Sequence, residues 1–359
     1  MLDLEVNLIV NLGLNSGIGR YSTELYRILS GRVRSLNLYS NPYSHSNVIP
    51  ISNVLSKHFA KNIICAPLVD WRNTILIKRS GILKDKNLHL VGSNYALCSE
   101  SNNVIMTVHE YYFILKELLN TRNLKDGVKQ LAFDYTLLKL RKQISFAQAV
   151  VAPSKYAANQ IHNAFGIRPI VIHETVDKSK FFPRDKRSAR MKLGLPLHKK
   201  FILNVSGGGL NKNLSNLTRI AGLLPKEYLI LKIGSPISNK NAINLHNVSE
   251  LAYPLYFAAS DLYINTSTQE GFNIPLLESI SSGLPVVSNK CATATEILAD
   301  SALYVKDSNN PFEYVSKIIQ AVENGDLNER ASNCINRSLL FNEEIAAKSY
   351  LDLYSKVFS

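Results

Sequence analysis

Short runs of apolar residues alternate along this chain with longer segments in which apolar residues recur at helical spacing. Such runs, bounded by polar or turn-forming residues, are typical of buried parallel strands, and the segments between them supply helical crossovers. The alternation therefore predicts an α/β architecture with parallel sheets. In the first half we expect strands at Val6–Val10, Arg34–Tyr39, Leu88–Gly92, Val104–Val108, Ala149–Val151 and Ile170–Ile172. In the second half we expect strands at Phe201–Val205, Tyr228–Ile233, Leu262–Asn265 and Pro285–Ser288.

The length of the chain and a polar interruption near its middle predict two domains. With 359 residues the chain exceeds the roughly 100 to 200 residues of an ordinary single domain. The stretch from Asp177 to Lys200 is rich in charged residues, so we place the linker there. The expected domains are residues 1–182 and 183–341. Residues 342–359 follow as a terminal helix, with Ile345, Ala346, Tyr350, Leu353 and Val357 near one face.

The segment from Glu270 to Glu278 places two carboxylates on either side of a predicted helix start. Pro275 has the fixed φ and missing N–H that suit the first helical position, so Glu270 belongs to the preceding loop and Glu278 to the first turns. Backbone N–H groups and the positive end of the helix dipole attract anions there, and Gly271 leaves room for close approach. Flanking carboxylates accept hydrogen bonds from hydroxyls. The segment therefore predicts a site for a phosphorylated ligand that carries a sugar.

A glycine-rich loop, Ser206 to Asn213, follows the predicted strand Phe201–Val205. Glycines at this place turn the chain and let its backbone approach a ligand, and Lys212 supplies a cation. The loop is not a Walker A motif, because Lys212 has no glycine before it and is followed by Asn213. Taken alone, such a stretch is more often a flexible turn than a binding loop. Together with the Glu270 segment it favours phosphate binding.

Glu270 and Glu278 resemble the Glu-x7-Glu motif of retaining GT-B-type glycosyltransferases, in particular family four. Further segments are similar to that family in the same order along the chain. They are the N-terminal glycine-rich loop Ser16–Leu25, the strand end Val104–Glu110 with His109, the segment Ala149–Lys155 and the phosphate loop Asn204–Asn213. Together these matches span nearly the whole chain.

The resemblance implies an α/β fold of the GT-B type, with two Rossmann-like parallel-sheet domains facing across a cleft and the terminal helix crossing back to the first. It implies a retaining hexosyltransferase that moves a sugar, with mannose suggested by family frequency, from a nucleotide diphosphate sugar to a hydroxyl. The implied acceptor is a glycan or lipid-linked molecule in bacterial surface polysaccharide synthesis, and no cofactor or metal is expected. Alternatives are a non-catalytic nucleotide-sugar or glycan-binding module, and a phosphorylase or epimerase on the same fold.

The resemblance also assigns roles to individual positions. Three groups of residues follow from it: Glu270, His109 and Lys212 for catalysis; Gly271, Phe272, Asn273, Ile274, Glu278, Ser206, Gly207 and Gly208 for donor binding; and Gly17 and Gly19 for a loop that contacts phosphate or acceptor.

The chain departs from the family pattern at several of these places. The arginine that usually precedes the loop lysine is missing, so either another basic side chain compensates or backbone amides carry more of the charge. Glu110 replaces the usual Asp after the histidine, Glu174-Thr175 replaces Asn-Gly, and Thr266-Ser267 replaces Pro-Ser. We expect the last two changes to affect donor or acceptor choice and not the chemistry itself.

Charge and composition limit the classes of partner that the chain is expected to bind. A formal net charge of +13 favours anionic partners. Basic residues interleave with leucines over residues 118–142, which predicts helices lying on an anionic membrane surface, or else an ordinary solvated helix face. No nucleic-acid-binding motif is present. Ser22 stands where a dinucleotide fingerprint needs its third glycine, which disfavours a dehydrogenase.

The sequence also bears on the compartment. No apolar run reaches the roughly 18 residues of a membrane span, and the first residues lack the basic start of a signal peptide. We therefore expect a cytoplasmic protein, with peripheral attachment to the inner face of the cell membrane as the option that the basic segment leaves open. Four scattered cysteines, with no C-x-x-C pair, are expected to be reduced thiols and not zinc ligands.

Overall fold

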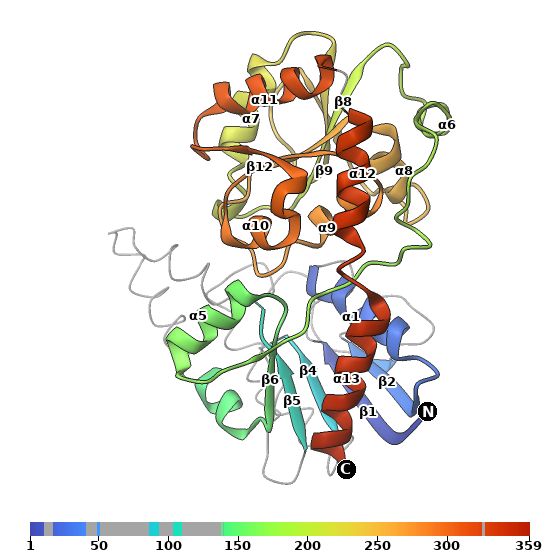
Figure 1. The fold of residues 1–359 in the computed structure, drawn as a ribbon, viewed down its shortest axis with the longest axis vertical. Helices are drawn as coiled ribbons and strands as arrows, with labels where there is room; N and C mark the ends of the chain where they lie inside the picture. Colours follow the sequence, from blue (N-terminus) through green and yellow to red (C-terminus); the bar gives the residue numbers. More distant parts are fainter. Residues whose placement is uncertain are drawn as a thin grey trace. The chain divides into compact units, whose positions relative to one another are not determined.

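The computed structural model describes residues 1–10, 17–40, 49–50, 86–92, 103–109, 138, 140–324 and 327–359. The chain divides into two compact units, one formed by Met1–Glu174 with Glu343–Ser359 and the other by Thr175–Asn342 (Figure 1). The boundary lies at Glu174 and not after residue 182, because Val176 and Phe181 are buried in the core of the second unit.

The first unit contains a parallel sheet with strand order β3-β2-β1-β4-β5-β6-β7. Its strands are β1 (Leu2–Val10), β2 (Val33–Ser40), β3 (Ile49–Pro50), β4 (Leu88–Val91), β5 (Val104–Thr107), β6 (Ala149–Ala152) and β7 (Ile170–Val171). Its helices are α1 (Gly17–Leu29), α5 (Lys155–Phe165) and the C-terminal α13 (Glu343–Phe358). All six strands predicted in this half are confirmed. The two-residue edge strand β3 was not predicted, since it is too short to carry an alternating pattern.

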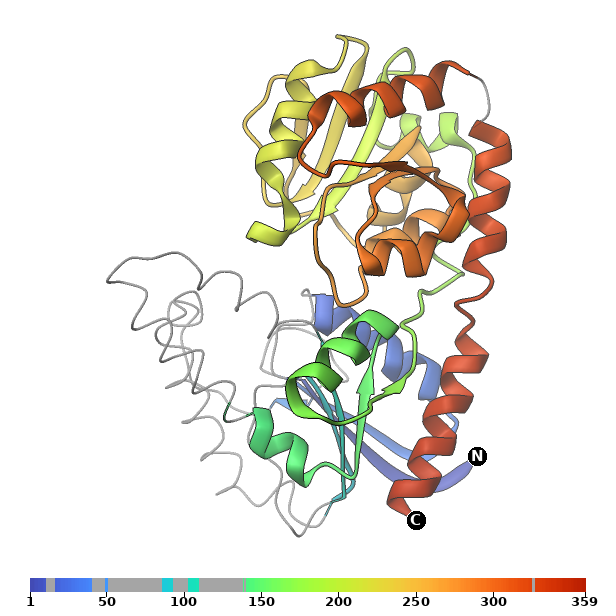
Figure 2. The same cartoon turned by 60° about the vertical axis from the view of Figure 1, so that its left-hand side comes forward.

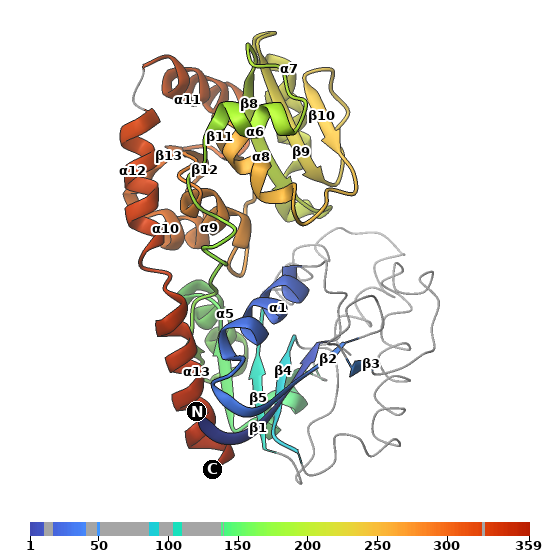
Figure 3. The same cartoon turned by 90° about the vertical axis from the view of Figure 1, so that its right-hand side faces the viewer.

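The C-terminal helix α13 packs against α1 and β1 of the first unit, as Figures 2 and 3 show in views turned about the vertical axis. The helix itself is confirmed, but its predicted face is partly wrong. Ala346, Tyr350 and Leu353 are buried, whereas Ile345 is 63% exposed. The buried side of the helix includes Ala347, Tyr354 and Phe358 instead.

The second unit contains a parallel sheet with strand order β10-β9-β8-β11-β12-β13. Its strands are β8 (Lys200–Ser206), β9 (Tyr228–Gly234), β10 (Ala242–Leu245), β11 (Leu262–Asn265), β12 (Val286–Asn289) and β13 (Ala302–Val305). Its α-helices are α6 (Lys186–Lys192), α7 (Leu214–Leu223), α8 (Tyr253–Ala259), α9 (Ile274–Ser281), α10 (Ala292–Leu298), α11 (Pro311–Glu323) and α12 (Leu327–Ser338). Two short 3-10 turns, η1 (Leu210–Lys212) and η2 (Ala299–Ser301), complete it.

Helices cover both faces of this second sheet (Figure 1). One hydrophobic cluster joins the sheet to α7 and α11, and the other joins it to α8, α9, α10 and α12. The four predicted strands of this half, which include all those between the two edges, are confirmed. The edge strands β10 and β13 were missed, because an edge strand is covered less fully and its apolar pattern is correspondingly weaker. The predicted parallel α/β architecture is therefore confirmed in both units.

Candidate functional site

The glycine-rich loop lies at the carboxyl end of β8, a central strand of the second sheet. Ser206 ends the strand, Gly207 to Gly209 are exposed, and Lys212 lies on the 3-10 turn η1. Asn213, with φ 50°, then starts α7 in the left-handed conformation that asparagine tolerates better than most residues. Ligands of parallel α/β sheets bind outside the carboxyl ends of the strands, so the loop has the location expected of a binding element.

The second loop of the site follows β11, the strand hydrogen-bonded next to β8. It runs from Thr266 to Asn273 and leads into α9. Asn273 occupies the N-cap position with φ 79°, and no side chain caps the helix by hydrogen bonding. Ile274 is the first helical residue, so Pro275 occupies the second position and not the predicted first. Two acids on either side of the helix start are nevertheless confirmed, with Glu270 in the loop and Glu278 in the helix.

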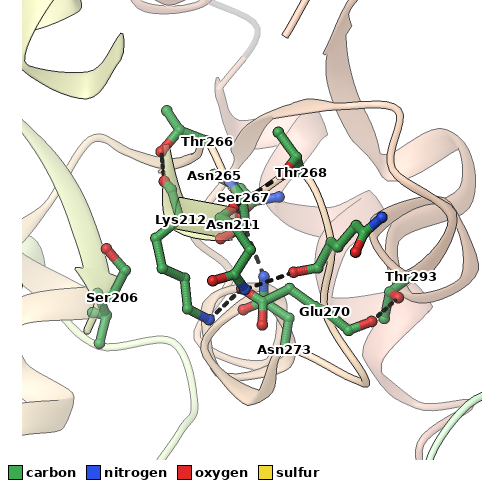
Figure 4. A network of polar contacts seen from close by, with 12 residues as sticks. Ser206, Asn211, Lys212, Asn265, Thr266, Ser267, Thr268, Glu270, Asn273 and Thr293 are labelled. Carbon is green, nitrogen blue, oxygen red and sulfur yellow. Dashed lines mark hydrogen bonds and ion pairs between the residues drawn. The ribbon is translucent and has the colours of Figure 1, made fainter. Parts of the chain in front are cut away.

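Hydrogen bonds tie these two loops together (Figure 4). The backbone oxygen of Asn211 accepts a bond from the Thr268 backbone N–H at 2.7 Å, and the Asn211 side chain donates to the Gln269 carbonyl at 2.9 Å. The Thr266 hydroxyl donates to the carbonyl of Lys212 at 2.8 Å. The backbone that carries Lys212 is therefore fixed relative to the backbone that carries Glu270.

The two charged side chains of these loops form an ion pair. The Lys212 ammonium lies 2.5 Å from Oε1 of Glu270, and the two side chains are 22% and 5% exposed. The Glu270 carbonyl accepts a hydrogen bond from the Thr293 hydroxyl of α10 at 2.6 Å, which holds the backbone at this position. The pair therefore presents a partly exposed ammonium beside a buried carboxylate, close in sequence to the start of α9.

Glu278 is fully buried one turn into α9. Its Oε2 accepts a hydrogen bond from the Tyr253 hydroxyl at 2.7 Å, and Tyr253 is the first residue of α8. A buried carboxylate is costly without such donors, so the hydroxyl stabilises its position. Nothing in the linear pattern pointed to Tyr253, because the contact depends on how α8 and α9 pack on the sheet.

Lys232 is a third charged residue of this region, and the sequence patterns did not single it out. It lies on β9, next to β8, and is fully buried. Its ammonium donates to the carbonyls of Ser206 at 2.7 Å and Ile233 at 2.8 Å. Burial, together with the positive charge of Lys212, lowers the pKa of Lys232 to about 7. The sequence feature that could have identified Lys232 is its position inside the otherwise apolar run Tyr228–Ile233.

The close contact between β8 and β9 explains why residue 234 is a glycine. Gly234 has φ +99°, and a Cβ atom there would lie 2.3 Å from the carbonyl oxygen of Ser206. The same oxygen accepts a hydrogen bond from the Ser235 backbone N–H at 3.0 Å. The first residue of the glycine-rich loop is thus held from the neighbouring strand by two donors, one backbone and one ammonium.

The remaining predicted site residues belong to the first unit. Gly17 begins α1 and Gly19 is buried within it. His109 follows β5, and its Nδ1 lies 3.3 Å from Oε1 of Glu174, the residue that departs from the family pattern. Nε2 of His109 is buried, and it neither accepts nor donates a hydrogen bond within the part of the chain that the structure describes. The edge of the Tyr21 ring contacts the imidazole, with 5.0 Å between ring centroids.

Several predictions lie outside the described residues. These are the roles suggested for Glu110, for most of the basic segment 118–142 and for Cys65 and Cys98. Cys291 and Cys334 are free thiols. None of the helices in the described ranges is long and apolar enough to cross a membrane. The same ranges contain no group of three or more His, Cys, Asp or Glu side chains arranged to hold a metal ion.

Comparison with known proteins shows which family the second unit resembles. Residues 185–338, which include both loops, match the family of glycosyl transferases group 1. The O-antigen chain mannosyltransferase B of Escherichia coli is 24% identical over 361 aligned positions, covering 88% of this chain and 90% of the relative.

Solved structures share the fold over nearly the whole chain. Sucrose-phosphate synthase from Thermosynechococcus elongatus superposes with a TM-score of 0.78 at 15% identity, covering 99% of both chains. Anabaena Alr3699/HepE in complex with UDP-glucose gives 0.75 at 15% identity, covering 98% of this chain and all of the other. The predicted GT-B fold is confirmed by these likenesses.

Proposed function

We propose that this chain, a glycosyltransferase with a group 1 domain at residues 185–338, transfers a hexose with retention from a nucleotide diphosphate sugar to a hydroxyl of a glycan or lipid-linked acceptor. The pathway we propose is synthesis of a bacterial surface polysaccharide. The observation that carries the proposal is the ion pair of Lys212 and Glu270 beside the start of α9. It combines a cation for phosphate with a carboxylate for sugar hydroxyls.

The chemistry that the site has to support is departure of a nucleoside diphosphate. The bond between the anomeric carbon and the phosphate oxygen breaks, and negative charge grows on the diphosphate. The Lys212 ammonium and the backbone N–H groups near Gly271 and Asn273 are suited to stabilise that charge electrostatically. We propose the same role for the backbone N–H groups of Ser206, Gly207 and Gly208, where no side chain larger than a hydroxymethyl group hinders close approach.

The two glutamates take different parts in this proposal. Glu278, held by Tyr253, would accept hydrogen bonds from the ribose hydroxyls. Glu270, held by Lys212, would accept hydrogen bonds from the hydroxyls of the transferred sugar. A carboxylate engaged by an ammonium is a weakened nucleophile, which supports attack by the acceptor on the same face as the leaving group over a glycosyl-enzyme intermediate. The acceptor hydroxyl then forms the new bond to the anomeric carbon, and its proton passes to the departing phosphate oxygen.

His109 and the start of α1 are proposed to act from the first unit. An imidazole next to Glu174 is able to donate a hydrogen bond to a sugar hydroxyl, and its buried Nε2 is the atom available for that contact. For Gly17 and Gly19 we propose contact between the helix start and the acceptor or the phosphates.

The identity of the sugar is proposed from relatives. An O-antigen mannosyltransferase among them supports mannose, and the UDP-glucose complex of a structural neighbour supports a nucleotide sugar as donor. We further propose that no divalent metal is required, because the Lys212 ammonium and the backbone N–H groups of the two loops together stabilise the charge of the leaving diphosphate. The basic segment 118–142 supports attachment to an anionic membrane surface on the cytoplasmic side, and no nucleic-acid partner is proposed.

A thermal-shift screen followed by an activity assay tests the proposal. The purified protein is heated with GDP-mannose, UDP-glucose, ADP-glucose or dTDP-glucose, and we expect one of them to raise its melting temperature. That donor is then incubated with excess EDTA. Release of nucleoside diphosphate that stops in the Glu270→Gln variant supports the enzyme, and an α-configured first product, seen by NMR, supports retention. Binding without turnover on any donor would select the non-catalytic binding module instead.

A further inference from the structure

The phosphate loop of the second unit contains a single basic side chain. Between the end of β8 and the start of α7, the residues are Ser206, three glycines, Leu210, Asn211, Lys212 and Asn213. The ammonium of Lys212 is already engaged with Glu270, so the net charge of that pair is close to zero. A diphosphate carries about two negative charges at neutral pH. The loop by itself therefore offers little positive charge for the ligand that the proposed function requires.

Lys232 supplies a second ammonium at the beginning of this loop. It lies on β9 with Asn204 of β8 and Asn244 of β10 as its register partners, so neither strand neighbour is charged. Two of its three N–H donors reach the carbonyls of Ser206 and Ile233. Within the described residues no carboxylate lies within ion-pair distance of it.

A buried lysine in this environment lowers the stability of the fold, so folding stability does not explain why a lysine occupies this position. Fully buried lysines are rare unless a carboxylate accompanies them, and an apolar side chain of the same length would pack on this face of the sheet without the cost of burying a charge. The lowered pKa of Lys232 reflects that cost and also the field of Lys212, the charged group that perturbs it. The two ammonium groups therefore interact, and an anion near Lys212 would also be attracted by Lys232.

We propose that Lys232 is a positioning residue for the donor diphosphate: it fixes the Ser206 carbonyl at the start of the glycine loop and adds a second positive charge to the phosphate site. The proposal depends on the proposed function, because it assumes a nucleotide sugar at Lys212. Lys232 does not touch the reacting atoms. It acts through the backbone of Ser206 and through its charge.

Proton uptake follows from this arrangement. Because burial and the charge of Lys212 lower the pKa of Lys232 to about 7, part of the free protein at neutral pH carries Lys232 in its neutral form. A bound diphosphate favours the charged form, so binding takes up protons, and the uptake is smaller at pH 6 than at pH 8. A nucleotide sugar is the right probe, since its diphosphate is doubly esterified and does not itself titrate in this range.

The experiment is isothermal titration of the nucleotide sugar selected by the thermal-shift screen, in two buffers of different ionisation enthalpy, at pH 6, 7 and 8. The wild type is compared with Lys232→Met and with Lys240→Met, which removes an exposed lysine from the same unit. We expect Lys232→Met to bind about tenfold more weakly and to lose the proton uptake, while Lys240→Met behaves as the wild type. Removal of a buried charge leaves the melting temperature of Lys232→Met equal or higher, which shows that it is folded.

Other outcomes separate the two proposals. If the wild type binds and Lys232→Met binds equally well, the role of Lys232 is wrong and the proposed function stands. Weaker binding with unchanged proton uptake also overturns it, because a purely structural lysine would give that result. If the wild type binds none of the four nucleotide sugars, the proposed function fails and the role of Lys232 fails with it.

Discussion

The Nζ atom of Lys212 lies 2.5 Å from Oε1 of Glu270, although the two residues are 58 positions apart in the chain. They meet because β8 and β11 are neighbours in the sheet and both loops leave the same edge of it. In a parallel sheet all carboxyl ends lie at one edge, so the strand order decides which loops touch. The contact thus joins the glycine-rich loop and the loop that leads into α9 into one site.

Replacing Lys212 by Met is expected to lower kcat on the order of 10²- to 10³-fold, since a positioned charge that stabilises a developing oxyanion contributes about that much. The measurement is initial-rate kinetics with the nucleotide sugar found in the screen. Lys226→Met, at an exposed lysine of the same unit, is the control and should keep the wild-type rate. Full activity of Lys212→Met would remove this residue from the site.

The ion pair also predicts non-additivity. Lys212→Met leaves the carboxylate of Glu270 buried without its ammonium, and Glu270→Gln leaves the ammonium without its carboxylate. Each single variant therefore carries a cost that the double variant avoids. In a double-mutant cycle on the free energy of unfolding, we expect the double variant to lose less stability than the sum of the two singles. Simple additivity would mean that the pair contributes nothing to stability.

Tyr253→Phe removes one hydroxyl, the donor to Oε2 of Glu278. If Glu278 binds the ribose, a loosened carboxylate should weaken nucleotide binding about tenfold, in line with roughly 1.5 kcal/mol for a hydrogen bond to a charged group. Titration calorimetry with the nucleoside diphosphate measures it. Tyr256→Phe, on the same helix α8, is the matched control. Glu278→Ala should weaken binding further, and unchanged affinity in both variants would place the ribose elsewhere.

Asp261 holds a buried arginine in the second unit. Its Oδ2 accepts hydrogen bonds from Arg190 at 2.7 Å and from the Phe201 backbone N–H at 2.8 Å. Asp261→Asn would leave the guanidinium of Arg190 buried without a countercharge, which typically costs about 3–5 kcal/mol. Urea unfolding, followed by circular dichroism, should show the loss. Lys186→Met removes only the half-exposed partner of Asp261, so we expect at most about 1 kcal/mol there.

His89 makes the first unit sensitive to acid. It is fully buried between the hydroxyls of Thr107 and Tyr354, and burial, with a smaller contribution from His109, lowers its pKa to about 3. The unfolded histidine titrates near 6.5, so between about pH 6.5 and 3 the unfolded chain binds more protons. The free energy of unfolding should therefore fall as pH falls through this window. In His89→Gln the slope should be shallower by up to about 1.4 kcal/mol per pH unit, and an equal slope would contradict the burial of a neutral imidazole.

Much of the fold follows from local sequence. The mostly apolar runs at Val104–Val108 and Phe201–Val205 predicted strands, because burial on both faces of a parallel sheet favours apolar residues at successive positions. Pro275 and the glycines after Ser206 marked a helix start and a turn, since proline and glycine restrict or widen φ without help from neighbours. The edge strands β10 and β13 were not predicted, because partial burial leaves a weaker apolar pattern in the sequence.

The amino-acid sequence and the tertiary structure each determined part of the candidate site. Sequence by itself determined that Lys212 and Glu270 lie in loops that follow strands and that Glu278 lies in the next helix. Only the tertiary structure decided that Lys212 pairs with Glu270, that Tyr253 holds Glu278 and that Lys232 reaches Ser206. The reason is physical: strand and helix patterns depend on residues a few positions apart, whereas these contacts depend on strand order and on the packing of helices across the sheet.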